Sequence, residues 1–342
     1  MDKKNYTIKD IANLASVSRG TVDRVLNNRG KVSEKARKKI EEVLNKIDYT
    51  PNLIARSLKN HRRYTIAILI PDDESDLYWM QMNQGIAEAS KEMESFGVRV
   101  DNYKLGVSKE EYYDSFQSVI ENRPDALIIV PYYTNNCFDL YLELETKSIP
   151  YVLLNSPIES VNYNSFIGQD YYQSGRTAGF LMNMMTDSST EDRRLLILNF
   201  DGKIENLTHV KEKEKGFIDY LKENDPKTTI DILYFKALNS KTISEKLKSV
   251  HGVYITNSKT HLIAKFLKLH PRLKVIGYDL IPENIKLIQE GTIDILLNQN
   301  PKLQGYYGVS FLAEYLLYGR EIPKTKLLPI DILTKENIEG YL

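Results

Sequence analysis

The 342-residue chain has a single cysteine, Cys137, so it cannot form an internal disulfide. No CxxC or HExxH motif accompanies its five histidines, and the sequence therefore gives no sign of a metal site. No apolar run approaches the ~20 residues that a bilayer span needs, and the opening residues MDKKNYTIKD contain no apolar signal-peptide core. We therefore expect a cytoplasmic protein with no metal, no cofactor and no membrane partner.

Catalytic motifs of α/β enzymes are also missing. The chain contains no GxGxxG, GxxxxGK[ST] or GxSxG motif. No predicted strand end places a nucleophile beside a histidine base. These absences argue against an enzyme built on a doubly wound sheet.

The net charge is zero as well, because a basic segment and an acidic segment of the chain cancel. Residues 1–63 hold 16 Lys or Arg against 7 Asp or Glu, a formal +9, and the remainder of the chain carries a formal −9. A basic segment joined to an acidic body is typical of a nucleic-acid-binding head on an effector or assembly domain. On charge alone, a solvated lysine-rich helical surface is an equally good interpretation.

The first fifty residues predict three short helices. Thr7 and Asp10 fit the capping box of an amphipathic helix over residues 7–15. Only a tight turn separates it from a second helix, for which Ser18 is the expected N-cap. Ser33 caps a third helix that runs to about residue 47. Two short helices joined by a tight turn make a helix-turn-helix.

In a helix-turn-helix, the second helix enters the major groove with its N-terminal residues at the base edges. Arg19 can address guanine O6 and N7, whereas Gly20 can only let the backbone approach. Phosphate ligands are expected at Ser18, Arg24, Arg29, Lys31 and Ser33. Asp23 is either an i, i+4 partner that orients Arg19, which we prefer, or an acceptor for a cytosine amine.

This segment carries a family resemblance. TIKDIANLASVSRGTVDRVLNNRGKVSEKAR, followed by IDYTPNLIARSL, resembles the DNA-binding head of the lactose-repressor (LacI-type) family over nearly all of the first sixty residues. The resemblance implies that PNLIARSL is a hinge helix that folds on operator binding, and that paired leucines of a dimer kink the DNA from its minor groove. Leu58 would be that wedge, and Asp23 departs from the family's usual Ser. The implied DNA-contacting set is Thr7, Ser18, Arg19, Gly20, Thr21, Arg24, Asn27, Arg29, Lys31, Ser33, Asn52, Ala55 and Leu58.

The expected domains are a head over 1–49, a hinge and linker over 50–63, and a body over 64–342. In the body, apolar β-rich runs alternate with amphipathic helical stretches, which indicates parallel sheets covered by helices on both faces. Eleven strands are expected, too many for one ordinary sheet, so the predicted fold is an all-α head plus an α/β body of two doubly wound parallel-sheet lobes. The predicted strands cover 65–71, 98–105, 125–131, 150–155, 165–170, 194–200, 230–235, 252–257, 274–279, 294–299 and 327–334.

Polar and aromatic side chains recur where these strands end, and ligands of such sheets bind beyond the carboxyl ends of the strands. Carboxylates and amides can bind neighbouring hydroxyl groups while an aromatic ring covers an apolar sugar face. Lys213 joins the set from an early helix. The predicted effector-binding residues are Asp76, Tyr78, Trp79, Asn155, Ser156, Asp170, Lys213, Asn257, Asp279 and Gln299.

The body resembles the type I periplasmic-binding-protein-like effector domain, especially its ribose-binding branch, over essentially all of residues 64–342. KEKEKGF, YITNS, VIGYD and LLNQNP match that family's ligand-contacting places. Two departures concern the ligand: Lys213 stands where an Arg usually clamps it, and Asn155-Ser156 replace a charged Asp-Arg pair. A cyclic sugar or sugar derivative is the expected ligand class.

Together these features predict a sequence-specific transcriptional regulator that binds a pseudo-palindromic operator as a homodimer and responds to a small-molecule effector. The chain end KENIEGYL shows no heptad run, which favours a dimer over a tetramer. Repression is the family's common output, and activation stays open. A sugar-binding receptor without DNA regulation and a head that binds DNA constitutively are the remaining alternatives.

Overall fold

The computed structural model describes residues 6–26, 30–47, 62–71, 76–106, 108–131, 137–158, 160–187, 192–200, 208–235 and 240–342. The chain divides into two compact units, Met1–Asn60 and His61–Leu342, and each is described by itself. The predicted hinge helix lies outside the described residues, as do Asn27, Arg29, Asn52, Ala55 and Leu58.

The head contains the three predicted helices, α1 (Ile8–Ala15), α2 (Arg19–Leu26) and α3 (Glu34–Lys46). Thr7 and Asp10 form the expected capping box, because each side chain bonds the other's backbone N–H. The tight turn before α2 depends on Ser16, which adopts a left-handed conformation with φ 52°. The apolar faces of the helices close one small core around Ile11, Val22 and Ile40.

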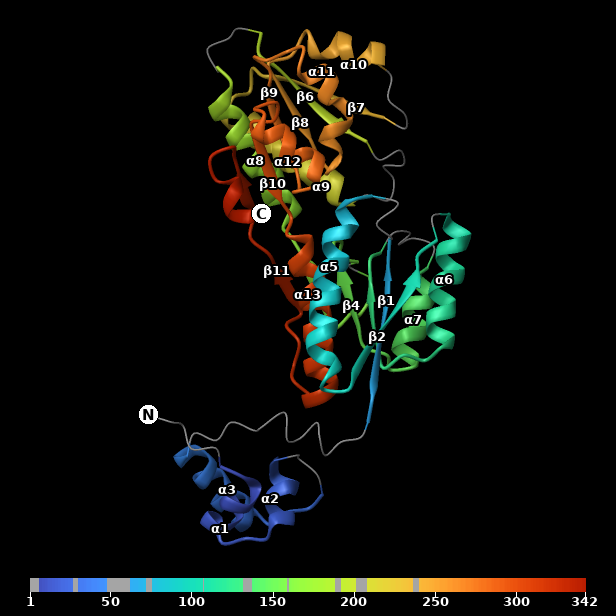
Figure 1. Ribbon diagram of the computed structural model, residues 1–342, viewed down its shortest axis with the longest axis vertical. Coiled ribbons are helices and arrows are strands. Elements are labelled where there is room, and N and C mark those ends of the chain that lie inside the picture. Colours follow the sequence, from blue (N-terminus) through green and yellow to red (C-terminus); the bar gives the residue numbers. More distant parts are fainter. Residues whose placement is uncertain are drawn as a thin grey trace. The chain divides into compact units, whose positions relative to one another are not determined.

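The body contains two six-stranded sheets with the same strand order, and each forms one lobe (Figure 1). Lobe 1 has the order β11-β5-β4-β3-β1-β2, and lobe 2 has the order β12-β10-β9-β8-β6-β7. The lobe 1 strands are β1 (Tyr64–Ile70), β2 (Val98–Lys104), β3 (Ala126–Ile129), β4 (Tyr151–Leu154), β5 (Ser165–Gly168) and β11 (Thr325–Leu327). The lobe 2 strands are β6 (Arg194–Asn199), β7 (Thr229–Tyr234), β8 (Gly252–Ile255), β9 (Lys274–Tyr278), β10 (Ile295–Asn298) and β12 (Asp331–Leu333).

Helices cover both faces of each sheet, as the apolar strands predict. In lobe 1, α5 (Tyr78–Glu94) and α13 (Pro301–Tyr318) pack on one face, and α6 (Lys109–Glu121) and α7 (Phe138–Thr146) on the other. In lobe 2, α8 (Tyr171–Met185) and α9 (Thr208–Asn224) cover one face. The other face carries α10 (Ser240–Leu247), η3 (Lys259–Ile263), α11 (Ala264–Leu267) and α12 (Pro282–Gln289), and η4 (Ile338–Tyr341) contributes Ile338 to the same core.

The expected strand over 327–334 is wrong, because this stretch forms two short strands in different sheets. β11 ends at Leu327 and pairs with β5 of lobe 1, whereas β12 begins at Asp331 and pairs antiparallel with β10 of lobe 2. Pro329 lies between them and has no N–H to continue a ladder. The segment is therefore a crossover, the third after those that follow β5 and β10.

The two-lobed α/β prediction is confirmed, with β12 as the antiparallel edge strand of an otherwise parallel sheet. Within the described parts of the chain, no helix is long and apolar enough to cross a bilayer.

Candidate DNA-contacting and effector sites

The tip of α2 presents exposed residues that its fold does not use. Ser18 caps the helix, since its Oγ accepts the Thr21 N–H at 3.1 Å. Arg19 and Gly20 follow as exposed residues of the first turn. A Cβ added to Gly20 would find only the Ser18 Oγ, at 3.8 Å. Packing within the head therefore does not require glycine at this position, although glycine weakens a helix by ~1 kcal/mol relative to alanine.

Further basic side chains lie on the same small unit. Arg24 in the last turn of α2 and Lys31 before α3 are exposed, and the Ser33 Oγ accepts the Ala36 N–H at 3.4 Å as the cap of α3. A helix-turn-helix with exposed arginines at its second helix is suited to binding a polyanion.

In lobe 2, three of the predicted effector residues form one buried polar cluster. Lys213 is fully buried on α9, and its Nζ donates to Gln299 Oε1 and to the Thr256 carbonyl oxygen, both at 3.0 Å. Asp279 is 1% exposed and accepts from Gln299 Nε2 at 2.6 Å and from the Gln299 backbone N–H at 3.1 Å. Burial raises the pKa of the Asp279 carboxyl to about 6, and the Lys213 cation acts in the opposite direction.

Two glycines allow α9, the helix that carries Lys213, to pack closely against α8. A Cβ at Gly175 of α8 would lie 2.0 Å from the Lys213 carbonyl oxygen, and one at Gly216 of α9 would lie 2.0 Å from the Tyr172 carbonyl oxygen. Only glycine allows the two backbones to approach this closely. The close contact of α8 and α9 therefore fixes the position of the Lys213 backbone, from which the side chain extends.

In lobe 1, Asn155 is the centre of the polar residues. It follows β4 with φ 68°, a left-handed conformation that asparagine tolerates better than most residues. The Tyr171 hydroxyl donates to Asn155 Oδ1 at 2.7 Å, and the Tyr78 hydroxyl lies 3.4 Å from the same oxygen. The Asn155 backbone N–H donates to Gln304 Oε1 at 3.1 Å. Burial raises the pKa of the Tyr78 and Tyr171 phenols above their ordinary value of 10.0, and both are hydrogen-bond donors at neutral pH.

Asp76 and Gln81 of lobe 1 also contact lobe 2 beside these clusters. Asp76, which precedes α5, accepts from Ser258 Oγ at 3.4 Å. The other Asp76 carboxylate oxygen lies 3.6 Å from Lys259 Nζ. Gln81 Nε2 donates to the Leu280 carbonyl oxygen at 2.6 Å.

A further contact between the lobes joins Ser156 Oγ and His209 Nδ1 of α9, 3.4 Å apart. The structure thus brings the carboxyl ends of the strands of the two sheets together, which is where ligands of open α/β sheets bind.

Three predicted residues lie less centrally. Trp79 packs into the lobe 1 core with its ring edge-on to Tyr78, 4.9 Å between centroids. Asp170 is an exposed N-cap of α8 and accepts the Gln173 N–H at 2.8 Å. Asn257 closes a turn after β8 through its Oδ1 and the Lys259 N–H at 3.1 Å. A ligand role for these three stays a prediction.

Tyr171, Gln304 and Gln81 belong to the site but were missed from the sequence. Gln304 accepts from Asn155 and donates through Nε2 to the Gln299 carbonyl oxygen at 2.9 Å, so it links residues at the ends of β4 and β10. Gln81 and Gln304 lie inside helices, away from strand ends, and a helical glutamine is ordinarily a surface residue. Tyr171 alone had a signal, because it directly follows the predicted strand over 165–170.

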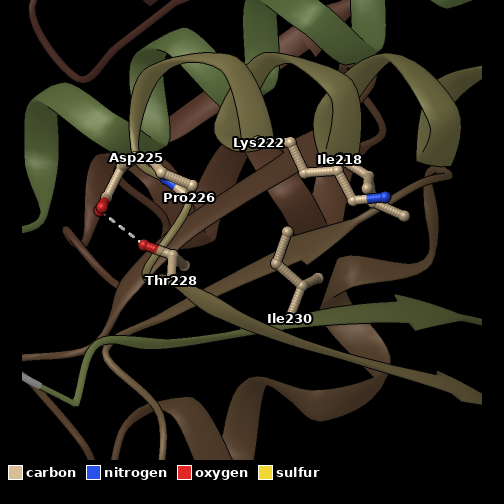
Figure 2. A pocket seen from close by; sticks show the side chains of 6 residues that line it. All are labelled: Ile218, Lys222, Asp225, Pro226, Thr228 and Ile230. Atoms are coloured by element: carbon tan, nitrogen blue, oxygen red, sulfur yellow. Dashed lines mark hydrogen bonds between the residues drawn. The ribbon is translucent and has the colours of Figure 1, made fainter.

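A cavity of about 320 Å³ opens elsewhere in lobe 2, between the end of α9 and the start of β7 (Figure 2). It lies at the amino end of β7, and Thr228 Oγ1 donates there to Asp225 Oδ2 at 2.6 Å. Its lining residues are Ile218, Lys222, Asp225, Pro226, Thr228 and Ile230, none of them a predicted effector residue. In the portion of the chain that is described, no group of three or more His, Cys, Asp or Glu is placed to hold a metal ion.

Comparisons with known proteins agree with both units. Residues 66–321 match the periplasmic binding protein domain, and residues 7–52 match the bacterial regulatory proteins of the lacI family. The ribose operon repressor of Lactococcus lactis is 27% identical over 97% of this chain and 98% of its own length. The transcriptional regulator RegA of Clostridium acetobutylicum is 39% identical, over 47% of this chain and 46% of RegA, so that match spans about half of each protein.

Among solved structures, a candidate LacI transcriptional regulator from Bacteroides fragilis superimposes with a TM-score of 0.74 and 27% identity, over 82% of this chain and 100% of that one. A lacI-type helix-turn-helix head is thus joined to a periplasmic-binding-protein body in one chain, and the protein belongs to the lacI family of bacterial regulatory proteins.

Proposed function

We propose that this protein is a sequence-specific transcriptional regulator whose operator affinity is controlled by a sugar or sugar derivative bound between the two lobes. The observation that carries the proposal is the meeting of two clusters, Asn155 with its tyrosines and Lys213 with Asp279 and Gln299, where the strands of the two sheets end. Such convergent amides, hydroxyls and charged groups suit a polyhydroxylated ligand. The ribose operon repressor, by its name, regulates a sugar operon.

On the DNA side, Arg19 reads a base edge and Arg24, Lys31, Ser18 and Ser33 bind phosphates. Thr7 and Thr21 support the same face, and Gly20 lets the backbone of α2 approach the groove. Asn27, Arg29, Asn52, Ala55 and the Leu58 wedge complete the proposed contacts. Two copies of the chain form a homodimer, so that paired heads bind a pseudo-palindromic operator.

On the effector side, the ligand acts by binding one arrangement of the lobes better than the other. The contacts of Asp76, Gln81 and Ser156 across the lobes belong to one such arrangement. A change of lobe angle alters the spacing of the paired heads and thus the operator affinity. We propose repression as the output, a cytoplasmic location, and no catalytic step.

The proposal is tested by selecting genomic DNA with the purified full-length protein and then titrating the selected operator. Arg19→Ala should relax the preference at one base pair of each half-site, and Arg24→Ala should weaken binding to all sequences about equally. Lys46→Ala, an exposed cation at the far end of α3, is the matched control and should change little.

The same preparation tests the effector half. A monosaccharide that binds the body should shift the operator titration curve, and it should change the fluorescence of Trp79, the only tryptophan, which packs against Tyr78.

Two outcomes would contradict the proposal. If Arg19→Ala and Arg24→Ala lose equal affinity for specific and for random DNA, the two arginines do not have the separate roles proposed for them. Sugar binding with no effect on operator affinity would indicate a receptor or a constitutive DNA binder.

A further inference from the structure

The chain passes between the two lobes three times. The first crossover is residues 169–170, between β5 and α8, the second is residues 299–300, between β10 and α13, and the third is residues 328–330, between β11 and β12. All of these residues belong to the described part of the chain. A change of the angle between the lobes concentrates its backbone torsion changes in these segments, because hinges are a few residues at the ends of elements.

One side chain of the first crossover bonds the backbone at the other two. Gln169 is 2% exposed. Its Nε2 donates to the carbonyl oxygen of Asn298, the residue before the second crossover, at 3.1 Å, and to that of Pro329 in the third crossover at 3.0 Å. A side-chain amide has two N–H groups, so these bonds use both of them. A single amide therefore joins all three crossovers.

Asn300 adds a second link, from the second crossover to the third. It has a left-handed backbone with φ 54°, and its Nδ2 donates to Asp331 Oδ2 at 2.8 Å and to the Pro329 carbonyl oxygen at 3.4 Å. The Pro329 carbonyl oxygen thus accepts from both the first and the second crossover. These bonds connect residues that lie more than 100 positions apart in the chain, and they depend on how the crossovers run past each other.

The oxygen of the Gln169 amide is not matched in the same way. Among the described residues, no hydrogen-bond donor lies at Gln169 Oε1, although the atom is buried. A buried amide oxygen without a partner lowers the stability of the structure that contains it. Local packing alone therefore gives little reason for a glutamine here, whereas both of its N–H groups have a partner at another crossover.

We infer that Gln169 is a positioning residue of the hinge, whose amide favours the arrangement of the lobes seen here by holding the three crossovers together. The unpartnered oxygen limits how strongly this arrangement is favoured, so that a second arrangement stays within reach of a ligand. The inference rests on the proposed function only for its link to operator affinity. The lobe arrangement itself can be measured without DNA or effector.

The test measures the distance between the lobes in the full-length protein. Spin labels are placed at Lys91→Cys on α5 of lobe 1 and Glu245→Cys on α10 of lobe 2, both exposed, after the buried Cys137 is replaced by Ala. Labelled chains are diluted with unlabelled chains, so that electron paramagnetic resonance records distances within one chain. Gln169→Met keeps the length of the side chain and removes both donors. It should change the ratio of the two lobe arrangements by about tenfold, the shift that one or two net hydrogen bonds produce.

Two further variants make the result specific to the hinge. Gln169→Asn keeps an amide that is one methylene too short to reach both carbonyl oxygens, and it should change the ratio in the same direction if Gln169→Met does not fold. Ser165→Ala is the matched control, because Ser165 is buried on the same strand and its Oγ donates to the Pro323 carbonyl oxygen at 2.7 Å within lobe 1. It should lower the melting temperature and leave the distance distribution unchanged.

An unchanged distance distribution in the folded Gln169 variants would overturn the inference and leave the proposed regulator standing. An equal change in Ser165→Ala would overturn it as well, because the effect would then follow any lost buried hydrogen bond. The affinity for the operator selected from genomic DNA separates the inference from the proposed function. If the distribution changes in Gln169→Met and the operator affinity does not, the hinge role of Gln169 is supported and the proposed control of operator affinity by lobe angle fails.

Discussion

Asn155 and Asp279 occupy the same place in the two lobes of the body. Each follows the third strand of a six-stranded sheet, β4 in lobe 1 and β9 in lobe 2, and each has a left-handed backbone, with φ 68° and φ 65°. Their surroundings differ, since the hydroxyls of Tyr78 and Tyr171 lie beside the Asn155 amide and a buried ammonium lies near the Asp279 carboxylate. The same strand order therefore places uncharged polar groups at this position in lobe 1 and a carboxylate near an ammonium in lobe 2.

The difference shows that strand order fixes where a site lies, whereas individual side chains fix what it can bind. Lobe 2 carries the cost of a buried charge pair, which is rarely retained for stability alone. Lobe 1 has no such cost at the equivalent position. Variants that remove the buried charge and variants that remove contacts between the lobes should show how much each contributes to the free energy of unfolding.

The largest expected effect is from Lys213→Met, which leaves the Asp279 carboxylate buried without its cation. The free energy of unfolding should fall by about 3–5 kcal/mol, the usual cost of breaking a buried pair from one side. Urea denaturation at pH 7.5 measures the loss. Lys211→Met, exposed on the same helix, should cost less than about 0.5 kcal/mol, and similar losses for both would show that Lys213 is not a paired buried charge.

The next effect is a pH dependence confined to lobe 2. Because burial raises the pKa of Asp279 from 3.8 to about 6, the folded protein holds this proton more tightly than the unfolded chain. The resulting stabilisation is complete below pH 3.8 and is lost as the pH rises through about 6. Relative to Asp279→Asn, the wild type should lose up to about 3 kcal/mol across this window. Parallel stability curves for the two proteins would contradict a raised pKa.

A smaller effect is expected from Gln304→Leu, which removes the link between the two clusters. The variant leaves the Asn155 N–H and the Gln299 carbonyl oxygen without this partner, which should lower the free energy of unfolding by about 1–3 kcal/mol. Gln173→Leu on α8 is the matched control, since Gln173 is exposed. Thermal unfolding of the two variants measures the difference, and equal melting temperatures would refute the link.

The smallest effect on stability is expected from Asp76→Asn, at the contact between the lobes. Its partner Lys259 is partly exposed, so the free energy of unfolding should change by less than about 1 kcal/mol. The distance distribution between spin labels on the two lobes, measured by electron paramagnetic resonance, should nevertheless broaden. An unchanged distribution would mean that other contacts hold this arrangement of the lobes.

Much of the fold could be predicted because its signals are local. Caps at Thr7, Ser18 and Ser33 fixed where the head helices begin, and alternating apolar strands and helices predicted two α/β lobes. The segment over 327–334 failed because its residues suit one strand in isolation, and only the positions of β5 and β10 divide it between two sheets.

The sequence by itself determined the helix-turn-helix, the two sheets and the polar residues at the strand ends, because periodicity, capping and turn chemistry act over a few residues. Only the tertiary structure decided which of those polar residues meet and that Gln304 joins them. It also decided that Lys213 and Asp279 share Gln299 as a hydrogen-bond partner. Burial and hydrogen-bond saturation depend on residues far apart in the chain, so no local pattern can encode them.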